Sequence, residues 1–134
     1  EVYSVSVGPI SPSWDRAIET FYQIKGGQVD YGNEKAVKYE IIQKPAHKEY
    51  AGLYPKWDGE HPVHIISHSQ GGQTARMLEI LLKQSSKEES SPLLSNNYIG
   101  WIKSITTIST PHNGTTLTDI MTTGIPFLQD FIAL

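Results

Sequence analysis

The sequence contains no cysteine, which excludes disulfide bonds and thiol chemistry and leaves the redox compartment undecided. It also lacks any apolar run of about 18 residues, the length that a membrane-spanning helix needs. Positive charge is scarce, because 11 Lys and Arg residues face 14 Asp and Glu residues, for a net charge of -3. A chain without a basic face binds phosphates poorly, so we expect no nucleic-acid partner.

The first residues carry neither the basic cluster nor the apolar core of a signal peptide. An export signal is therefore either absent or encoded upstream. Tyr3, Val5 and Val7 alternate with serines, which is the period of a strand with one buried face. A Gly-Pro pair ends this pattern, and we predict a strand at residues 1–7.

Two stretches have the apolar spacing of amphipathic helices, at residues 11–25 and 73–83. Residues 62–67 and 102–110 are rich in β-branched residues, as buried strands are, and the polar stretch 85–91 predicts an exposed loop. Residues 28–59 have a mixed pattern that could hold a short helix and long loops. The expected buried helix faces are Trp14, Ala17, Ile18 and Phe21, and then Ala75, Leu78, Leu81 and Leu82. This alternation favours a single α/β domain with parallel strands.

A short motif, SHSQGG from Ser67 to Gly72, joins the strand at 62–67 to the following helix. Small residues stand two places before and two places after Ser69. A sharp strand-to-helix turn needs them there, because their backbones press against the neighbouring strand and helix. Such a turn presents a serine hydroxyl at the carboxyl edge of the sheet. We predict Ser69 as the attacking nucleophile and the backbone N–H of Gln70 as an oxyanion donor.

Longer motifs on both sides resemble the secreted staphylococcal and bacillus-type triacylglycerol lipases, which have the α/β-hydrolase fold. The motifs are VYSVSVGP at 2–9, WDR at 14–16, VDYG at 29–32, HSQGGQTAR at 68–76 and SITTISTPHNGTT at 104–116. The resemblance runs nearly from end to end. It implies a single partial α/β-hydrolase domain over residues 1–134, with a mostly parallel sheet and flanking helices, truncated at both ends.

The resemblance also implies the chemistry, which is hydrolysis of long-chain acylglycerol esters at an oil–water interface, outside the cell. Ser69 would attack the ester and Gln70 would bind the oxyanion. The triad Asp and His, the second oxyanion donor and the calcium ligands would lie beyond this segment, and residues 126–134 would begin a lid helix. We expect the 134 residues alone to hydrolyse esters negligibly, since a serine without its base is a weak nucleophile. The sequence predicts no oligomeric state.

The resembling lipases hold a structural zinc ion with two Asp and two His residues. Here Asp15 matches one ligand position, whereas Lys35 and Ile41 stand where the histidines are expected. One carboxylate cannot make a tetrahedral site, so we predict no zinc and no other cofactor in this segment. His47 fits the ligand pattern poorly and is more typical of an exposed loop.

Other polar residues are weaker candidates for catalysis. His112 follows a strand and could serve as a base, although the resemblance gives this stretch a role in loop geometry. His68 adjoins Ser69, but neighbouring side chains across a turn point apart. The rest are more typical of structural or exposed positions: His61, His64, Asp58, Asp119, Asp130, Trp14 and Trp57. The main alternative function is a non-catalytic α/β-hydrolase-like binding or scaffold protein, and an acyltransferase or peptidase with the same turn is a third.

Overall fold

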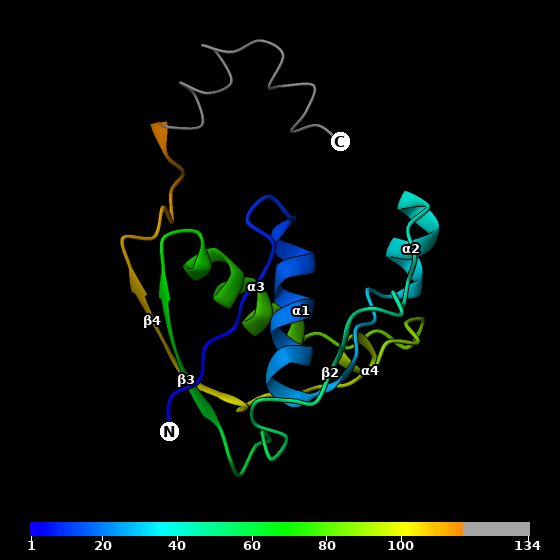
Figure 1. Ribbon diagram of the computed structural model, residues 1–134, viewed down its shortest axis with the longest axis horizontal. Coiled ribbons are helices and arrows are strands. Elements are labelled where there is room, and N and C mark those ends of the chain that lie inside the picture. Colours follow the sequence, from blue (N-terminus) through cyan, green and yellow to red (C-terminus); the bar gives the residue numbers. More distant parts are fainter. Residues whose placement is uncertain (117–134) are drawn as a thin grey trace.

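The computed structural model describes residues 1–116, which form an α/β arrangement of helices and short strands (Figure 1). The elements are α1 Ser13–Lys25, β1 Gly27–Gln28, α2 Asn33–Tyr39, β2 Glu49–Tyr50, β3 Val63–His68, α3 Gly71–Lys83, α4 Pro92–Ser95 and β4 Ile102–Ile108. Within this range every helix is too short or too polar to span a membrane. The lid helix expected at residues 126–134 lies outside the described residues.

Strands β3 and β4 pair in parallel, with Ile65 opposite Ile105 and His68 opposite Ile108. Helix α3 follows β3 in the chain and packs against both strands and against α1. The predicted strand–helix–strand unit is therefore confirmed. β1 and β2 form a separate antiparallel ribbon of two residues each. Residues 1–116 thus contain two two-stranded sheets, and the larger, mostly parallel sheet of the prediction is not seen among them.

The segment before α1 is not a strand, so that prediction is wrong for the described structure. Val2 is 97% exposed, and Tyr3 and Val5 are exposed as well. The Ser6 backbone forms hydrogen bonds with the Gln23 side chain instead of with a neighbouring strand. The Ser6 N–H donates to Gln23 Oε1 at 2.9 Å, and Gln23 Nε2 donates to the Ser6 carbonyl at 2.7 Å. Alternating apolar residues form a stable strand only when a partner strand and a core face are both present.

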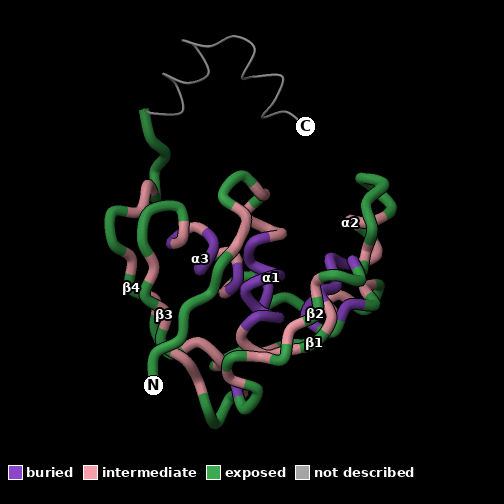
Figure 2. The backbone as a smooth tube through the Cα atoms, viewed as in Figure 1, coloured by how far each residue is buried: buried purple, intermediate pink, exposed green. Residues whose placement is uncertain are grey.

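The core lies where α1 and α3 pack together, and Figure 2 shows buried residues in both helices. Aromatic side chains beside the helices extend this core. The predicted helix stripes are buried, apart from Trp14, which is half-buried. The Phe21 ring centroid lies 5.6 Å from that of Trp57. Trp57 is fully buried, as core packing requires, and its indole N–H donates to the Trp101 carbonyl at 2.7 Å. This contact fixes the loop before β3 against the start of β4.

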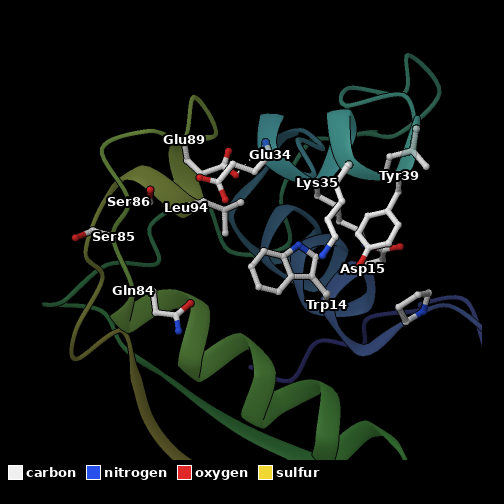
Figure 3. Close-up of a pocket in the computed structure, with 13 residues that line it drawn as sticks. Trp14, Asp15, Glu34, Lys35, Tyr39, Gln84, Ser85, Ser86, Glu89 and Leu94 are labelled. Atoms are coloured by element: carbon white, nitrogen blue, oxygen red, sulfur yellow. Dashed lines mark hydrogen bonds and ion pairs between the residues drawn. The ribbon is translucent and has the colours of Figure 1, made fainter.

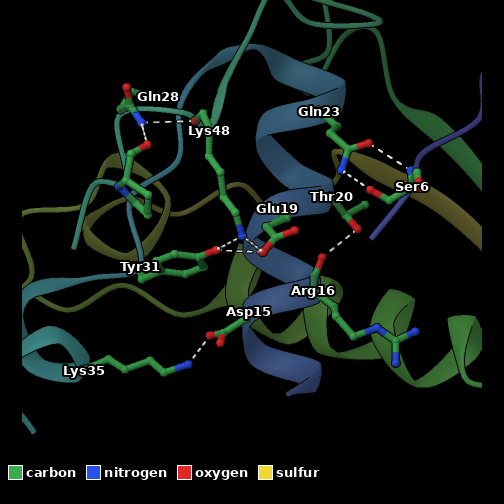
Figure 4. Close-up of polar contacts among 11 residues, drawn as sticks. Ser6, Asp15, Arg16, Glu19, Thr20, Gln23, Gln28, Tyr31, Lys35 and Lys48 are labelled. Carbon is green, nitrogen blue, oxygen red and sulfur yellow. Dashed lines mark hydrogen bonds and ion pairs between the residues drawn. The ribbon is translucent and has the colours of Figure 1, made fainter. Parts of the chain in front are cut away.

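A polar cluster ties the chain after α1 back to that helix (Figure 4). The Tyr31 hydroxyl donates to Glu19 Oε1 at 2.7 Å, and Lys48 Nζ donates to the same oxygen at 2.6 Å and to Tyr31 Oη at 2.7 Å. Burial raises the pKa of Tyr31 to about 12, with Glu19 adding to the rise and Lys48 opposing it. Burial alone would lower the pKa of Lys48, but hydrogen bonds to Glu19 and Tyr31 raise it above its ordinary value.

The start of α3 is closely packed against the segment that follows β4. A Cβ atom built on Gly72 would overlap Thr110 Oγ1 and lie 2.6 Å from Thr110 Cγ2. At the preceding residue, Gly71, the nearest atom to an added Cβ would be Ser67 Cβ at 3.5 Å, an ordinary contact. Position 72 therefore requires glycine for space, and position 71 does not.

We predict that stability falls as the pH rises from 10 to 12. Tyr31 keeps its proton in the folded chain to about pH 12, whereas the unfolded chain loses it near the ordinary pKa of 10.0. Its stabilisation is therefore complete below pH 10 and is lost progressively as the pH rises to about 12, and the raised pKa of Lys48 acts in the same direction. Denaturant unfolding of Tyr31→Phe should show a shallower decline. Tyr39 is exposed, and its hydroxyl has no hydrogen-bond partner within residues 1–116, so Tyr39→Phe should keep the wild-type slope. Equal slopes for all three proteins would contradict this account.

We further predict that Gly72→Ala destabilises the chain by about 1–3 kcal/mol, the usual cost of forcing a methyl group into a filled space. Gly71→Ala should be close to neutral, because its methyl group meets no close neighbour. Adding Thr110→Ala to Gly72→Ala should restore only part of the loss, because it removes Oγ1 and Cγ2 but leaves Thr110 Cβ, which would lie 2.8 Å from the new methyl carbon. Chemical denaturation measures all three variants. A Gly72→Ala protein as stable as Gly71→Ala would show that the two segments do not pack as described.

Candidate active site

Ser69 lies in a sharp turn between the last residue of β3 and the first residue of α3. Its φ is +52°, a left-handed backbone conformation that costs a residue with a side chain about 1–2 kcal/mol. Its N–H donates to the Ile108 carbonyl at 2.9 Å, and its own carbonyl accepts from the Gly72 N–H at 3.1 Å. Ser69 is exposed. The strand–turn–helix geometry predicted for this position is therefore present.

The residues on either side of the turn explain why the chain can bend here. Ser67 stands where glycine is commoner, and it fits with room to spare, since even a Cβ atom added at position 71 would lie 3.5 Å from Ser67 Cβ, an ordinary contact. The Ser67 hydroxyl lies 3.4 Å from the Thr106 carbonyl of the neighbouring strand. The serine is thus accommodated between β3, α3 and β4.

The N-terminus of α3 points its unpaired backbone donors toward this turn. Gln70 is the N-cap residue, with φ -60° and ψ -19°, and no side chain caps the helix there. Its backbone N–H donates no hydrogen bond within the described residues. The first turn of α3 contains no acidic residue. The partial positive charge of the helix end is therefore available to an anion beside Ser69.

Two of the weaker candidates form a pair far from this turn. His61 Nδ1 lies 2.9 Å from Asp58 Oδ1, and this hydrogen bond lowers the pKa of Asp58. Both residues precede β3, whereas Ser69 follows it. Six residues of strand, at about 3.3 Å each, put roughly 20 Å between them. The pair cannot serve Ser69 as an acid and a base.

Two of the remaining histidines lie within hydrogen-bond distance of other side chains. His112 Nε2 lies 3.0 Å from Thr107 Oγ1, and His64 Nδ1 lies 2.7 Å from Ser104 Oγ. His68 and His47 are exposed. Within residues 1–116, no histidine or carboxylate hydrogen-bonds to the Ser69 hydroxyl. Two other candidate acids, Asp119 and Asp130, lie outside the described residues.

The residues at the zinc-ligand positions of the resembling lipases do come together, although no zinc site is predicted here. Asp15, Lys35 and Ile41 line one cavity of about 1090 Å³ between α1, α2 and the segment after α3 (Figure 3). The Lys35 ammonium forms an ion pair with Asp15 Oδ1. Ser69 is not among the residues that line this cavity.

The structure also contains a feature that the sequence analysis missed. Ser109, the first residue after β4, has a φ of +50°. The paired strands β3 and β4 are thus each followed by a serine in the left-handed conformation, Ser69 and Ser109. The sequence offers no signal for Ser109, because left-handed positions are usually marked by glycine or asparagine and here the residue is neither.

Comparison with known proteins places these features in a family. The family described as "Lipase-like, C-terminal domain" matches residues 1–126. Lipase 1 of Staphylococcus aureus (strain NCTC 8325 / PS 47) is 42% identical over an alignment of 130 residues that covers 90% of this chain and 19% of the relative. The chain therefore spans about a fifth of the length of the curated relatives it matches.

Two solved structures are similar over almost the whole chain. Lipase 1 from Pelosinus fermentans gives a TM-score of 0.80 at 41% identity, covering 97% of this chain and 35% of that one. Staphylococcus hyicus lipase gives a TM-score of 0.80 at 37% identity, covering 92% and 34%. The resemblance to staphylococcal lipases seen in the sequence is confirmed, and the chain belongs to the lipase-like C-terminal domain family.

Proposed function

We propose that this chain is the nucleophile-bearing part of a serine hydrolase, a triacylglycerol lipase with an α/β-hydrolase fold, in which Ser69 attacks the ester. The observation that carries this proposal is the exposed, left-handed Ser69 between a parallel strand and the free N-terminus of a helix. A residue held in a strained conformation next to unpaired donors is typical of a reactive site. The lipase names of the relatives support the same reaction class.

The reaction follows from the chemistry of these groups. Ser69 Oγ attacks the carbonyl carbon of the ester while its proton passes to a histidine base. The Gln70 N–H donates to the oxyanion that forms, and loss of one such donor typically costs about 3 kcal/mol of barrier. The alcohol leaves with the proton from the histidine, and an acyl-serine remains. Water, deprotonated by the same base, then attacks the acyl-serine, releasing the fatty acid and the free Ser69 hydroxyl.

The base and its acidic partner, in this proposal, belong to parts of the protein beyond residues 1–134. Two observations support this: Ser69 has no such partner within residues 1–116, and this chain covers only 34–35% of the two solved lipases. The second oxyanion donor is assigned there as well. The 134 residues alone should then hydrolyse esters negligibly. The substrate is proposed to be a long-chain acylglycerol at an oil–water interface, outside the cell, by analogy with the relatives.

We predict that the full-length protein releases fatty acid from tributyrin emulsions, and that Ser69→Ala lowers kcat by about 10⁴-fold or more, because only oxyanion and binding contributions remain. Ser109→Ala is the matched control, since it also changes a left-handed serine after a parallel strand. It should keep activity within about tenfold of the wild type. A titration of released acid measures the rates, and thermal unfolding checks that both variants are folded.

The same assay separates the alternatives. Soluble p-nitrophenyl esters and peptides are offered alongside tributyrin. Preference for a soluble ester would contradict the lipase assignment and indicate an esterase, and peptide cleavage would indicate a peptidase. A folded wild-type protein that turns over none of these substrates would support the binding or scaffold alternative. Ester hydrolysis by the 134-residue chain alone would overturn the assignment of the base to other parts of the protein.

A further inference from the structure

Two carboxylates and two ammonium groups form a neutral cluster on one face of α1 (Figure 4). Asp15 and Glu19 are four residues apart and so lie on the same side of the helix. Lys35, from α2, pairs with Asp15, and Lys48 pairs with Glu19 at 2.6 Å. The Tyr31 ring lies near both cations, with its centroid 5.9 Å from Lys35 Nζ and 5.5 Å from Lys48 Nζ. The chain that follows α1 is thus held on the helix by two lysines.

The residues at this place do not fit the zinc ion that the lipase resemblance implies. The Asp15 carboxylate is already neutralised by Lys35, and the two side chains are only 19% and 17% exposed. A dication beside that ammonium would meet strong repulsion, because nearby charges interact more strongly away from water. Ile41, at the second histidine position, lines the same cavity and has no donor atom. Within residues 1–116, no three His, Cys, Asp or Glu side chains gather as a metal site requires.

We infer that the Lys35 ammonium takes the structural place of a metal ion in this protein, joining α2 to α1 through Asp15, so that this region folds without zinc. The ammonium supplies a compact positive charge and three hydrogen-bond donors, which suit a carboxylate in the first turn of α1. Breaking a largely buried ion pair leaves a carboxylate without its partner, which costs far more than breaking an exposed pair. The inference does not depend on the hydrolytic activity of Ser69.

Zinc content and thermal unfolding of the full-length protein test the metal part of this inference. After exposure to zinc and desalting into calcium-containing buffer, elemental analysis should find well below one zinc per chain. A zinc-selective chelator such as 1,10-phenanthroline should leave the melting temperature unchanged, and calcium in the buffer protects any calcium site from this treatment. Bound zinc at one per chain, together with a lower melting temperature on chelation, would overturn the inference.

Variants at three positions test the role of the ammonium itself. Lys35→Met should lower the melting temperature by about 4 °C or more, because Asp15 loses its partner. Lys38→Met is the matched control, since Lys38 lines the same cavity from the same helix. Its ammonium lies 5.2 Å from the Tyr39 ring centroid and forms no ion pair within residues 1–116. It should change the melting temperature little. Equal effects of the two substitutions would overturn the structural role of Lys35.

A double variant tests whether Lys35 stands where a metal could bind. Lys35→His with Ile41→His would place two imidazoles beside Asp15, giving three potential zinc ligands. Added zinc should bind this variant and raise its melting temperature, while the wild type should not respond. A folded double variant that binds no zinc would contradict the placement of Lys35 at a metal position.

Discussion

The left-handed backbone of Ser69 is the constraint on which the site depends. A residue with a side chain keeps this conformation only when the contacts around it offset the strain. Two such contacts are present here. The Ile108 carbonyl holds the Ser69 N–H, and Gly72 lets α3 approach Thr110. The parallel pairing of β3 with β4 therefore does more than build a sheet. It places the carboxyl end of one strand where it can hold the turn at the end of the other.

The rest of the described chain gives this turn a rigid base. Helix α3 starts at the turn and packs on α1, so the apolar faces of the two helices fix the direction in which α3 leaves Ser69. The aromatic cluster around Trp57 ties the loop before β3 to the start of β4. The paired carboxylates and lysines on the opposite side of α1 attach the α2 region. Apolar packing thus supports the site, and ion pairs secure the segment farther from it.

The sequence predicted those parts of the structure whose determinants are local. The i, i+3, i+4 spacing predicted α1 and α3, and the small residues around Ser69 predicted the turn. Helices and tight turns depend mainly on residues that are near in the sequence. The strand predicted at residues 1–7 was wrong because pairing is non-local and Gln23 takes the Ser6 backbone instead. The left-handed Ser109 and the Lys48–Tyr31–Glu19 cluster could not be predicted, since each joins residues distant in sequence or lacks a distinctive residue type. The roles of Ser69 and Gln70 remain predictions that only chemistry can test.

The central claim is that Ser69 is the nucleophile. Its most direct test is to find which residue is modified by a fluorophosphonate, a reagent that reacts with activated serine hydroxyls. The full-length protein is treated, digested and mapped by tandem mass spectrometry. A single adduct on Ser69, with Ser67 and Ser109 unmodified, is the result that this account predicts. An enzymatically active preparation whose activity is blocked by the reagent while the adduct lies on a different residue would contradict it.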